Sequence, residues 1–159
     1  MDKIERSLEL FSCEPKELSE AFQTLVSEAK NALSKSYSPY SKFAVGAAAL
    51  LDNGEIVKGA NQENAAYPSG LCAERVALFS AGVQFPQHKV KALAVALAEP
   101  IDKWPFPCGA CLQVMAETRE RQGEEIELLL LHPTLEKVLW SKELANLLPF
   151  AFNKDYLEP

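Results

Sequence analysis

The chain has 159 residues, with 16 basic and 22 acidic side chains, a formal net charge of −6 at pH 7 and 48% hydrophobic residues. This length and apolar content predict a single domain over residues 1–159 with a core of its own, and they exclude a disordered chain. The acidic balance disfavours nucleic acid as a partner, because such binding relies on Lys and Arg to neutralise phosphates. We therefore expect a small or uncharged ligand.

The first residues and the cysteines indicate the compartment. No basic segment followed by an apolar run opens the sequence, so we expect no signal peptide. No apolar run approaches the ~20 residues of a membrane span, so we expect no membrane partner. Four cysteines in a chain with these features predict a cytoplasmic protein. In that compartment, paired cysteines more often bind metal or do redox chemistry than form structural bridges.

Helical and strand patterns alternate from the start of the chain. Residues 1–15 form a predicted N-terminal extension without a regular pattern. The elements expected in the first hundred residues are an amphipathic helix over 16–36, paired strands over 43–51 and 55–59, a buried helix over 73–81 ended by Gly82, and a buried strand over 90–98. The polar stretch 61–70 is a predicted loop.

The second part of the chain repeats this alternation. The expected elements are a proline-rich loop over 100–107, a helix over 108–121 ended by Gly123, a strand over 126–131, a short strand over 138–140 and a last helix over 141–148 ended by Pro149. Two strands are apolar throughout, which is typical of a sheet covered on both faces. The fold class is therefore α/β, a three-layer α/β/α sandwich with a mixed, roughly five-stranded sheet.

Three cysteines stand at predicted helix starts. Cys108 and Cys111 lie three residues apart, so both sulfurs face the same side of the first turn, and Cys72 stands before its own helix. A helix N-terminus favours thiolate, the form that binds zinc. Three sulfur ligands would leave the fourth position of a tetrahedral zinc ion open for water, as a catalytic zinc requires.

Glu74 and Arg75 follow directly after Cys72. A carboxylate on an apolar helix face is costly to bury without a task, and beside a zinc-bound water Glu74 could take up and hand on the proton. The metal would lower the pKa of that water from 15.7 to about 7. Three thiolates leave the metal cluster at net −1, which the Arg75 guanidinium would offset by donating to the sulfurs.

Cys72-Ala73-Glu74-Arg75 and Pro107-Cys108-Gly109-Ala110-Cys111 together resemble the motifs of the small, homotetrameric, three-cysteine cytidine deaminases. The resemblance runs from about Tyr37 to Phe152. Its further segments are Tyr40-Ser41-Lys42-Phe43, Val45-Gly46-Ala47, Asn61-Gln62-Glu63-Asn64-Ala65 and Leu147-Leu148-Pro149. It implies a cytidine deaminase-like fold with one zinc ion per subunit, held by Cys72, Cys108 and Cys111, and zinc-dependent hydrolysis of cytidine and deoxycytidine to uridine and deoxyuridine in pyrimidine salvage.

The resemblance also implies roles for residues outside the metal motifs. The counterparts of Asn61 and Glu63 hydrogen-bond the ribose, the counterpart of Phe43 packs against the pyrimidine, and Ala73 belongs to the substrate-binding set. A C-terminal phenylalanine matching Phe152 reaches into a neighbouring subunit's site, which implies a homotetramer with shared active sites. A neutral nucleoside suits this chain, which has no Gly-rich phosphate loop.

Other interpretations remain open from the residues. A related aminopyrimidine such as blasticidin S could be the substrate, since its deaminase shares the zinc motifs. With Cys13 as a fourth ligand the chain would be a structural-zinc interaction module, and Cys108 and Cys111 alone could form a thioredoxin-like redox pair. Phe152 could instead cover the core of its own subunit.

The sequence departs from the family pattern at several positions. Leu112 stands where many relatives have Arg, and Ala60 stands where they often have Cys. Residues 103–106 are an insert beside the expected site, where they could alter substrate choice. His88 and His132 adjoin turns, and we expect both at the surface.

Overall fold

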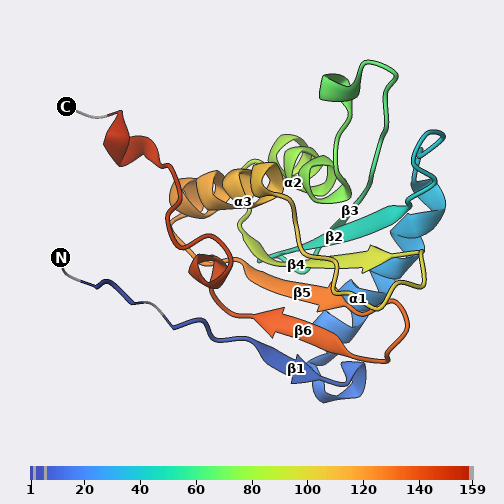
Figure 1. Ribbon diagram of the computed structural model, residues 1–159, viewed down its shortest axis with the longest axis horizontal. Helices are drawn as coiled ribbons and strands as arrows, with labels where there is room; N and C mark the ends of the chain where they lie inside the picture. The colour runs from blue at the N-terminus through green and yellow to red at the C-terminus, as the bar shows by residue number, and fades with distance from the viewer. Residues whose placement is uncertain (2, 6, 158–159) are drawn as a thin grey trace.

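A mixed six-stranded sheet forms the middle layer of the protein, in the strand order β1-β6-β5-β4-β2-β3 (Figure 1). This computed structural model describes residues 1, 3–5 and 7–157; residues 2 and 6 of the predicted extension and residues 158–159 at the end of the predicted domain lie outside the described part. The strands are β1 (Phe11–Cys13), β2 (Val45–Leu51), β3 (Ile56–Ala60), β4 (Val90–Leu97), β5 (Glu127–Leu131) and β6 (Val138–Ser141). Among these strands only β4 and β5 pair in parallel.

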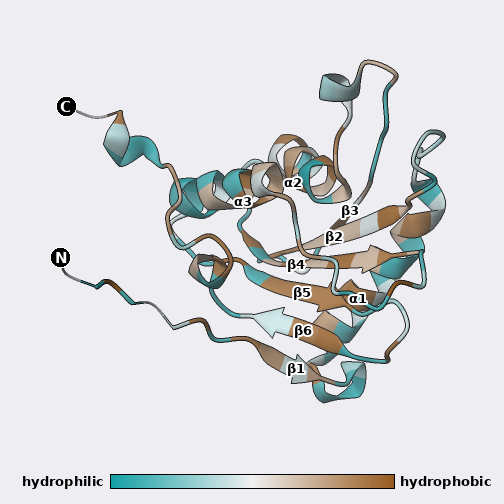
Figure 2. Cartoon of the chain, viewed as in Figure 1, coloured by the Kyte–Doolittle hydropathy of each residue, from teal (hydrophilic) through white to brown (hydrophobic). Residues whose placement is uncertain are grey.

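Helices cover both faces of the sheet, which confirms the predicted α/β sandwich. One face carries α1 (Glu20–Ala32), and the other carries α2 (Ala73–Gln84) and α3 (Gly109–Gln122) (Figure 1). Successive strand residues point to opposite faces, so β2 sends Ala47 and Ala49 into the core beneath α2, and Ala48 and Leu50 into the core beneath α1. The central strands are accordingly mostly apolar (Figure 2), and the charged residues of β4 and β5 lie near their starts, at Lys91 and Glu127.

The sixth strand is the main departure from the roughly five predicted. It comes from the N-terminal extension, where Phe11 pairs with Trp140 and Cys13 with Val138 on β6. The backbone N–H and C=O of Glu9 both bond the side chain of Asn146, at 3.3 and 2.9 Å. These long-range contacts define the strand, because three residues alone carry no strand pattern.

The bounds of α1 and α2 differ from the prediction, and α1 ends at Ala32, where a 3-10 turn over Leu33–Lys35 follows. The helix predicted over 16–36 begins later, at Glu20, because the Ser19 side chain accepts the backbone N–H of Phe22 and caps it. The helix predicted to stop at Gly82 continues to Gln84, because Gly82 does not adopt the left-handed conformation that ends a helix. Helix α3 does end at Gly123, whose φ of 69° is the left-handed conformation that glycine favours.

The last predicted helix, 141–148, is not formed. Ser141 belongs to β6, and a 3-10 turn at Leu144–Asn146 replaces the helix. The backbone N–H of Leu144 donates to Glu125 and the Leu144 side chain enters the core, so tertiary contacts hold this segment in place of helical hydrogen bonds. Every helix in the described ranges is too short or too polar to cross a membrane.

Candidate active site

Three cysteine sulfurs converge between the N-termini of α2 and α3. Cys72 and Cys108 are the N-cap residues of these helices, and Cys111 lies in the first turn of α3. The Sγ atoms of Cys72 and Cys108 are 3.8 Å apart, and those of Cys108 and Cys111 are 3.5 Å apart. All three sulfurs lie within 4.8 Å of one another. Sulfurs bound at about 2.3 Å to one tetrahedral zinc ion are roughly 3.8 Å apart, so the group fits that metal.

The environment of the sulfurs favours negative charge on Cys72. Hydrogen bonds from Cys111, then from Arg75 and Cys108, lower the pKa of Cys72 to about 5, against the opposing effect of burial. Cys111 donates its thiol proton in the hydrogen bond to Cys72, and this bond, together with burial, raises the pKa of Cys111. A metal ion would compete with this proton for the thiolates.

Arg75 provides a positive charge beside the cysteine group. Its Nη2 donates to Cys72 Sγ at 3.7 Å, and this contact raises the pKa of the guanidinium above its ordinary value. The side chain comes from α2, one turn beyond Cys72. The geometry therefore places the guanidinium where it offsets the charge of the sulfurs.

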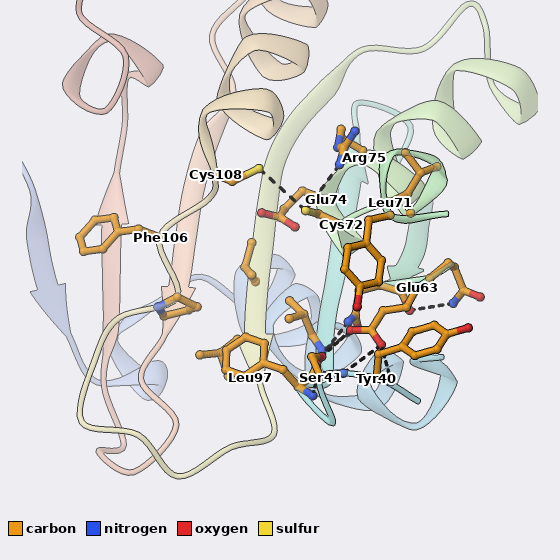
Figure 3. Close-up of a pocket in the computed structure, with 18 of the residues that line it drawn as sticks. Tyr40, Ser41, Glu63, Leu71, Cys72, Glu74, Arg75, Leu97, Phe106 and Cys108 are labelled. Carbon is orange, nitrogen blue, oxygen red and sulfur yellow. Dashed lines mark hydrogen bonds between the residues drawn. The ribbon is translucent and has the colours of Figure 1, made fainter. Parts of the chain in front are cut away.

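Glu74 lies on the cavity side of α2 beside Cys72 and Cys108 (Figure 3). It is 4% exposed, and burial is the main cause that raises the pKa of its carboxyl group; the charge of Cys72 adds to the shift. A buried carboxyl group with a raised pKa that faces a cavity is a candidate general acid and base.

A cavity of about 1050 Å³ opens over Cys72, Cys108 and Glu74. This volume lies slightly above the range of about 300–1,000 Å³ for small-molecule sites. Apolar walls dominate it, and Phe43, Val95, Leu97 and Trp104 are among them. The polar groups of Asn61 and Glu63 lie on its rim, so an apolar ring with polar substituents suits its lining.

Asn61 holds the segment just before β2, where Phe43 lies; the predicted strand start at residue 43 is thus two residues too early. Its Oδ1 accepts from Ser36 Oγ at 2.6 Å and from the backbone N–H of Val45 at 2.8 Å, and its Nδ2 donates to the Phe43 carbonyl at 2.8 Å. An amide side chain has two donors and two lone pairs. These contacts therefore leave one N–H of Asn61 for a ligand.

Glu63 is bound by the loop before Phe43, as Figure 3 shows. Its Oε2 accepts the backbone N–H groups of Tyr40 and Ser41, and its Oε1 accepts the Ser41 hydroxyl. The hydroxyl contact is the largest cause that lowers the pKa of Glu63, so the carboxylate stays ionised. One lone pair of Oε1 remains for a ligand.

The remaining predicted substrate residues lie in different places. Phe43 lines the cavity with 36% of its surface exposed. Ala73 is fully buried, and its side chain packs in the core beneath α2, outside the cavity lining. Phe152 lies away from this cavity: it is 56% exposed, stacks on Tyr156 with ring centroids 5.4 Å apart, and accepts at its carbonyl from Gln113.

Sequence reasoning missed two features of the site. Tyr40 and Ser41 bind Glu63, whereas the motif that contains them in the sequence indicates no role for these two residues. His132, predicted at the surface, is 7% exposed, because it lies beneath the loop that contains Trp104. The predicted insert at 103–106 does line the cavity. Cys13 packs on the α1 side of the sheet and donates to Val138 O, outside the cysteine group.

Comparison with known proteins gives a consistent result. Residues 19–122 match the model of the cytidine and deoxycytidylate deaminase zinc-binding region. The chain is 42% identical over 137 residues to a cytidine deaminase of Sporosarcina psychrophila, covering 85% of this chain and 93% of the relative. It is 41% identical over 132 residues to a cytidine deaminase of Mycobacterium tuberculosis, covering 81% and 87%.

Solved structures are similar over most of the chain. The crystal structure of cytidine deaminase from Burkholderia pseudomallei superposes with a TM-score of 0.70 at 37% identity, covering 85% of this chain and all of the other. That of the Mycobacterium tuberculosis enzyme gives a TM-score of 0.64 at 35% identity, covering 83% of this chain and 97% of the other. Residues 19–122, which the family model matches, include Cys72, Cys108 and Cys111.

Proposed function

This chain belongs to the family of cytidine and deoxycytidylate deaminases with a zinc-binding region, and from that premise we propose that it is an enzyme that hydrolyses cytidine and deoxycytidine to uridine and deoxyuridine. The observation that carries the proposal is the position of Glu74 beside three convergent cysteine sulfurs at the base of an apolar cavity. The reaction adds water across the N3=C4 bond of the pyrimidine and then releases the 4-amino group as ammonia.

Cys72, Cys108 and Cys111 are the residues that would hold one zinc ion per subunit. Zinc bound by three protein ligands supplies a water molecule acidic enough to react near neutral pH. The sulfur spacings support this assignment, and so does Arg75, which donates to Cys72 and reduces the charge of the group. Cys13 has no part in it, because it packs on the other side of the sheet.

Glu74 moves the protons in the proposed mechanism. Its carboxylate takes a proton from the attacking water and delivers it to N3 of the pyrimidine as the C4–O bond forms. It then carries the second proton of that water to the 4-amino nitrogen, so that ammonia leaves as the C4–N bond breaks. Burial suits this role, because it raises the pKa of Glu74 toward the pH at which the enzyme works.

The rim of the cavity would bind the sugar. Asn61 has one N–H left and Glu63 has one lone pair left, so together they offer a donor and an acceptor to the ribose hydroxyls. Phe43, held by the same asparagine, would pack against the pyrimidine. Ala73 would contribute through its backbone, since its side chain is buried.

We further propose a homotetramer that acts on free nucleosides in pyrimidine salvage in the cytoplasm. The tail supports shared sites, because Phe152 is exposed and lies away from its own cavity. The cavity would then be completed by the tail of a neighbouring subunit. A reducing compartment suits the three free thiols of the metal site.

The test is to incubate purified protein separately with cytidine, deoxycytidine, cytosine, CMP and blasticidin S and to follow ultraviolet absorbance. We expect the spectra of cytidine and deoxycytidine to change to those of the uracil nucleosides. Cytosine lacks the sugar that Asn61 and Glu63 would bind, so it should react far more slowly. Conversion of blasticidin S with no change in cytidine would contradict the proposal.

A further inference from the structure

The loop before α3 forms one wall of the cavity. Its lining residues are Ile101, Lys103, Trp104, Pro105 and Phe106. Figure 3 shows Phe106 on the side of the cavity away from Tyr40 and Glu63. Within the loop the backbone bonds run from Ile101 to Glu99 and from Phe106 to Trp104, two residues apart in each case. Such local bonds give little rigidity, so side-chain contacts must hold the wall in place.

His132 supplies those contacts from a different element, the turn after β5. Its side chain is 3% exposed, and its ring meets the Trp104 ring edge to face, with centroids 4.8 Å apart and an interplanar angle of 87°. Its Nε2 lies 3.4 Å from Asp102 Oδ1. His132 thus contacts two residues of the loop without itself lining the cavity.

The other ring nitrogen fixes the orientation of His132. Its Nδ1 accepts the backbone N–H of Leu135 at 3.1 Å and that of Thr134 at 3.3 Å. A nitrogen that accepts carries no proton, so the neutral ring carries its hydrogen on Nε2, toward Asp102. The ring is therefore held by the turn on one side and presents its other side to the loop.

We propose that His132 is a positioning residue for substrate binding, which holds Trp104 in the cavity wall and so sets how tightly the nucleoside is enclosed. The proposal rests on the proposed function. It assigns His132 an effect on KM, because the groups that act on C4 lie on α2 and α3 and do not contact His132. It also explains why a histidine beside a turn is buried.

Two substitutions distinguish the hydrogen bonds of His132 to its own turn from the contact of its ring with Trp104. His132→Asn keeps an acceptor for the amides of Thr134 and Leu135 but removes the ring, whereas His132→Phe keeps a ring for Trp104 but removes the acceptor. We expect His132→Asn to raise the KM for cytidine about three- to tenfold while kcat changes less than about twofold. His132→Phe should lower thermal stability and leave KM closer to the parent. If His132 only stabilised its own turn, His132→Phe would raise KM more than His132→Asn, because it is His132→Phe that removes the acceptor of the turn.

A double-variant cycle tests whether His132 acts through Trp104. Trp104→Ala should raise KM by itself, and adding His132→Asn should then have little further effect, because the contact is already lost. His88→Asn is the matched control: this histidine is exposed and pairs with Asp52 at 2.8 Å, so its KM should equal that of the parent. An unchanged KM in His132→Asn, or effects that multiply in the double variant, would overturn the proposal.

A measurement without substrate distinguishes this proposal from the function on which it rests. The tryptophan emission that is lost in Trp104→Phe belongs to Trp104, and in His132→Asn it should shift to longer wavelength as the ring meets water. An emission shift with no cytidine turnover in the parent would refute the proposed function alone. An unshifted emission would refute the His132–Trp104 contact whatever the activity.

Discussion

At the scale of single residues, Glu74 combines two properties that are rarely found together. It is almost fully buried, which disfavours its charged form and raises its pKa, yet it lines a cavity that a small molecule can enter. A structural carboxylate in such a place would require a close cation, whereas the Arg75 guanidinium donates to Cys72. The pattern is that of a group that exchanges protons with a ligand.

We expect Glu74→Gln to retain zinc and lose turnover. The amide has the same shape and leaves the three sulfurs in place, but it cannot carry a proton, so kcat should fall by a factor of about 10² to 10⁴. Elemental analysis and the absorbance assay measure the two quantities. Glu117→Gln, on an exposed position of α3, is the control. A Glu74→Gln protein that turns over at a near-parental rate would disprove proton transfer by Glu74.

Cys108 lies in the cysteine group and Cys13 lies outside it, so metal analysis of serine variants should distinguish the two residues. Cys108→Ser should lose zinc and activity together, since it removes one of three convergent ligands. Cys13→Ser should retain both, because Cys13 contacts Val138 on the opposite side of the sheet. Loss of metal from Cys13→Ser would show that the site has a fourth protein ligand and is structural.

At the scale of elements, the close packing of α2 against β3 positions Cys72 and Glu74. A Cβ at Gly59 would lie 2.4 Å from the carbonyl oxygen of Ala73 and 2.5 Å from the backbone nitrogen of Ala77. The helix therefore approaches the strand as closely as a glycine permits. Since Ala73 is flanked by Cys72 and Glu74, this contact sets the depth of both functional groups.

Gly59→Ala should therefore affect both stability and catalysis. The added methyl group must push the N-terminus of α2 outward, and we expect a loss of about 1–3 kcal/mol in the free energy of unfolding. Activity should fall as well, because Glu74 moves with the helix. Gly82→Ala, within α2, is the matched control and should stabilise by about 0.5–1 kcal/mol. Denaturant unfolding and the rate assay would show the contrast; equal behaviour of the two variants would refute the close-packing argument.

The elements that sequence could predict are those with local signals. The zinc motifs and the buried strands β4 and β5 carry their patterns in a few consecutive residues, and the structure has them where the sequence placed them. Strand β1 and the turn at Leu144–Asn146 depend on partners far along the chain: Glu9 on Asn146, and Leu144 on Glu125. The burial of His132 likewise depends on a loop almost thirty residues earlier, which periodicity cannot reveal.

At the scale of the whole molecule, the cavity and the tail are separated within one chain. The cavity exceeds the usual volume for a small ligand. The family resemblance assigns Phe152 to substrate binding, but in this chain Phe152 packs on Tyr156, outside the lining of the cavity. A symmetric assembly reconciles the two, because each tail can then serve a neighbour's cavity.

Subunit mixing tests this arrangement. Phe152→Ala and Glu74→Gln should each have low activity alone, but when the two proteins are dissociated and reassembled together, activity should return. The reason is that some mixed assemblies pair an intact Glu74 in one chain with an intact Phe152 from another. Light scattering would report whether each variant forms the proposed tetramer. Full activity and full tetramer content in Phe152→Ala alone would rule out a shared site.

The position of β1 has a practical consequence for work with this protein. Its three residues occupy the hydrogen-bonding edge of β6, which would otherwise present free amides and carbonyls to other molecules. The family match starts at residue 19 and so omits this strand. A truncated protein that began at residue 19 would leave the edge of β6 unpaired. Its aggregation would then result from the loss of β1 and not from a defect in the active site.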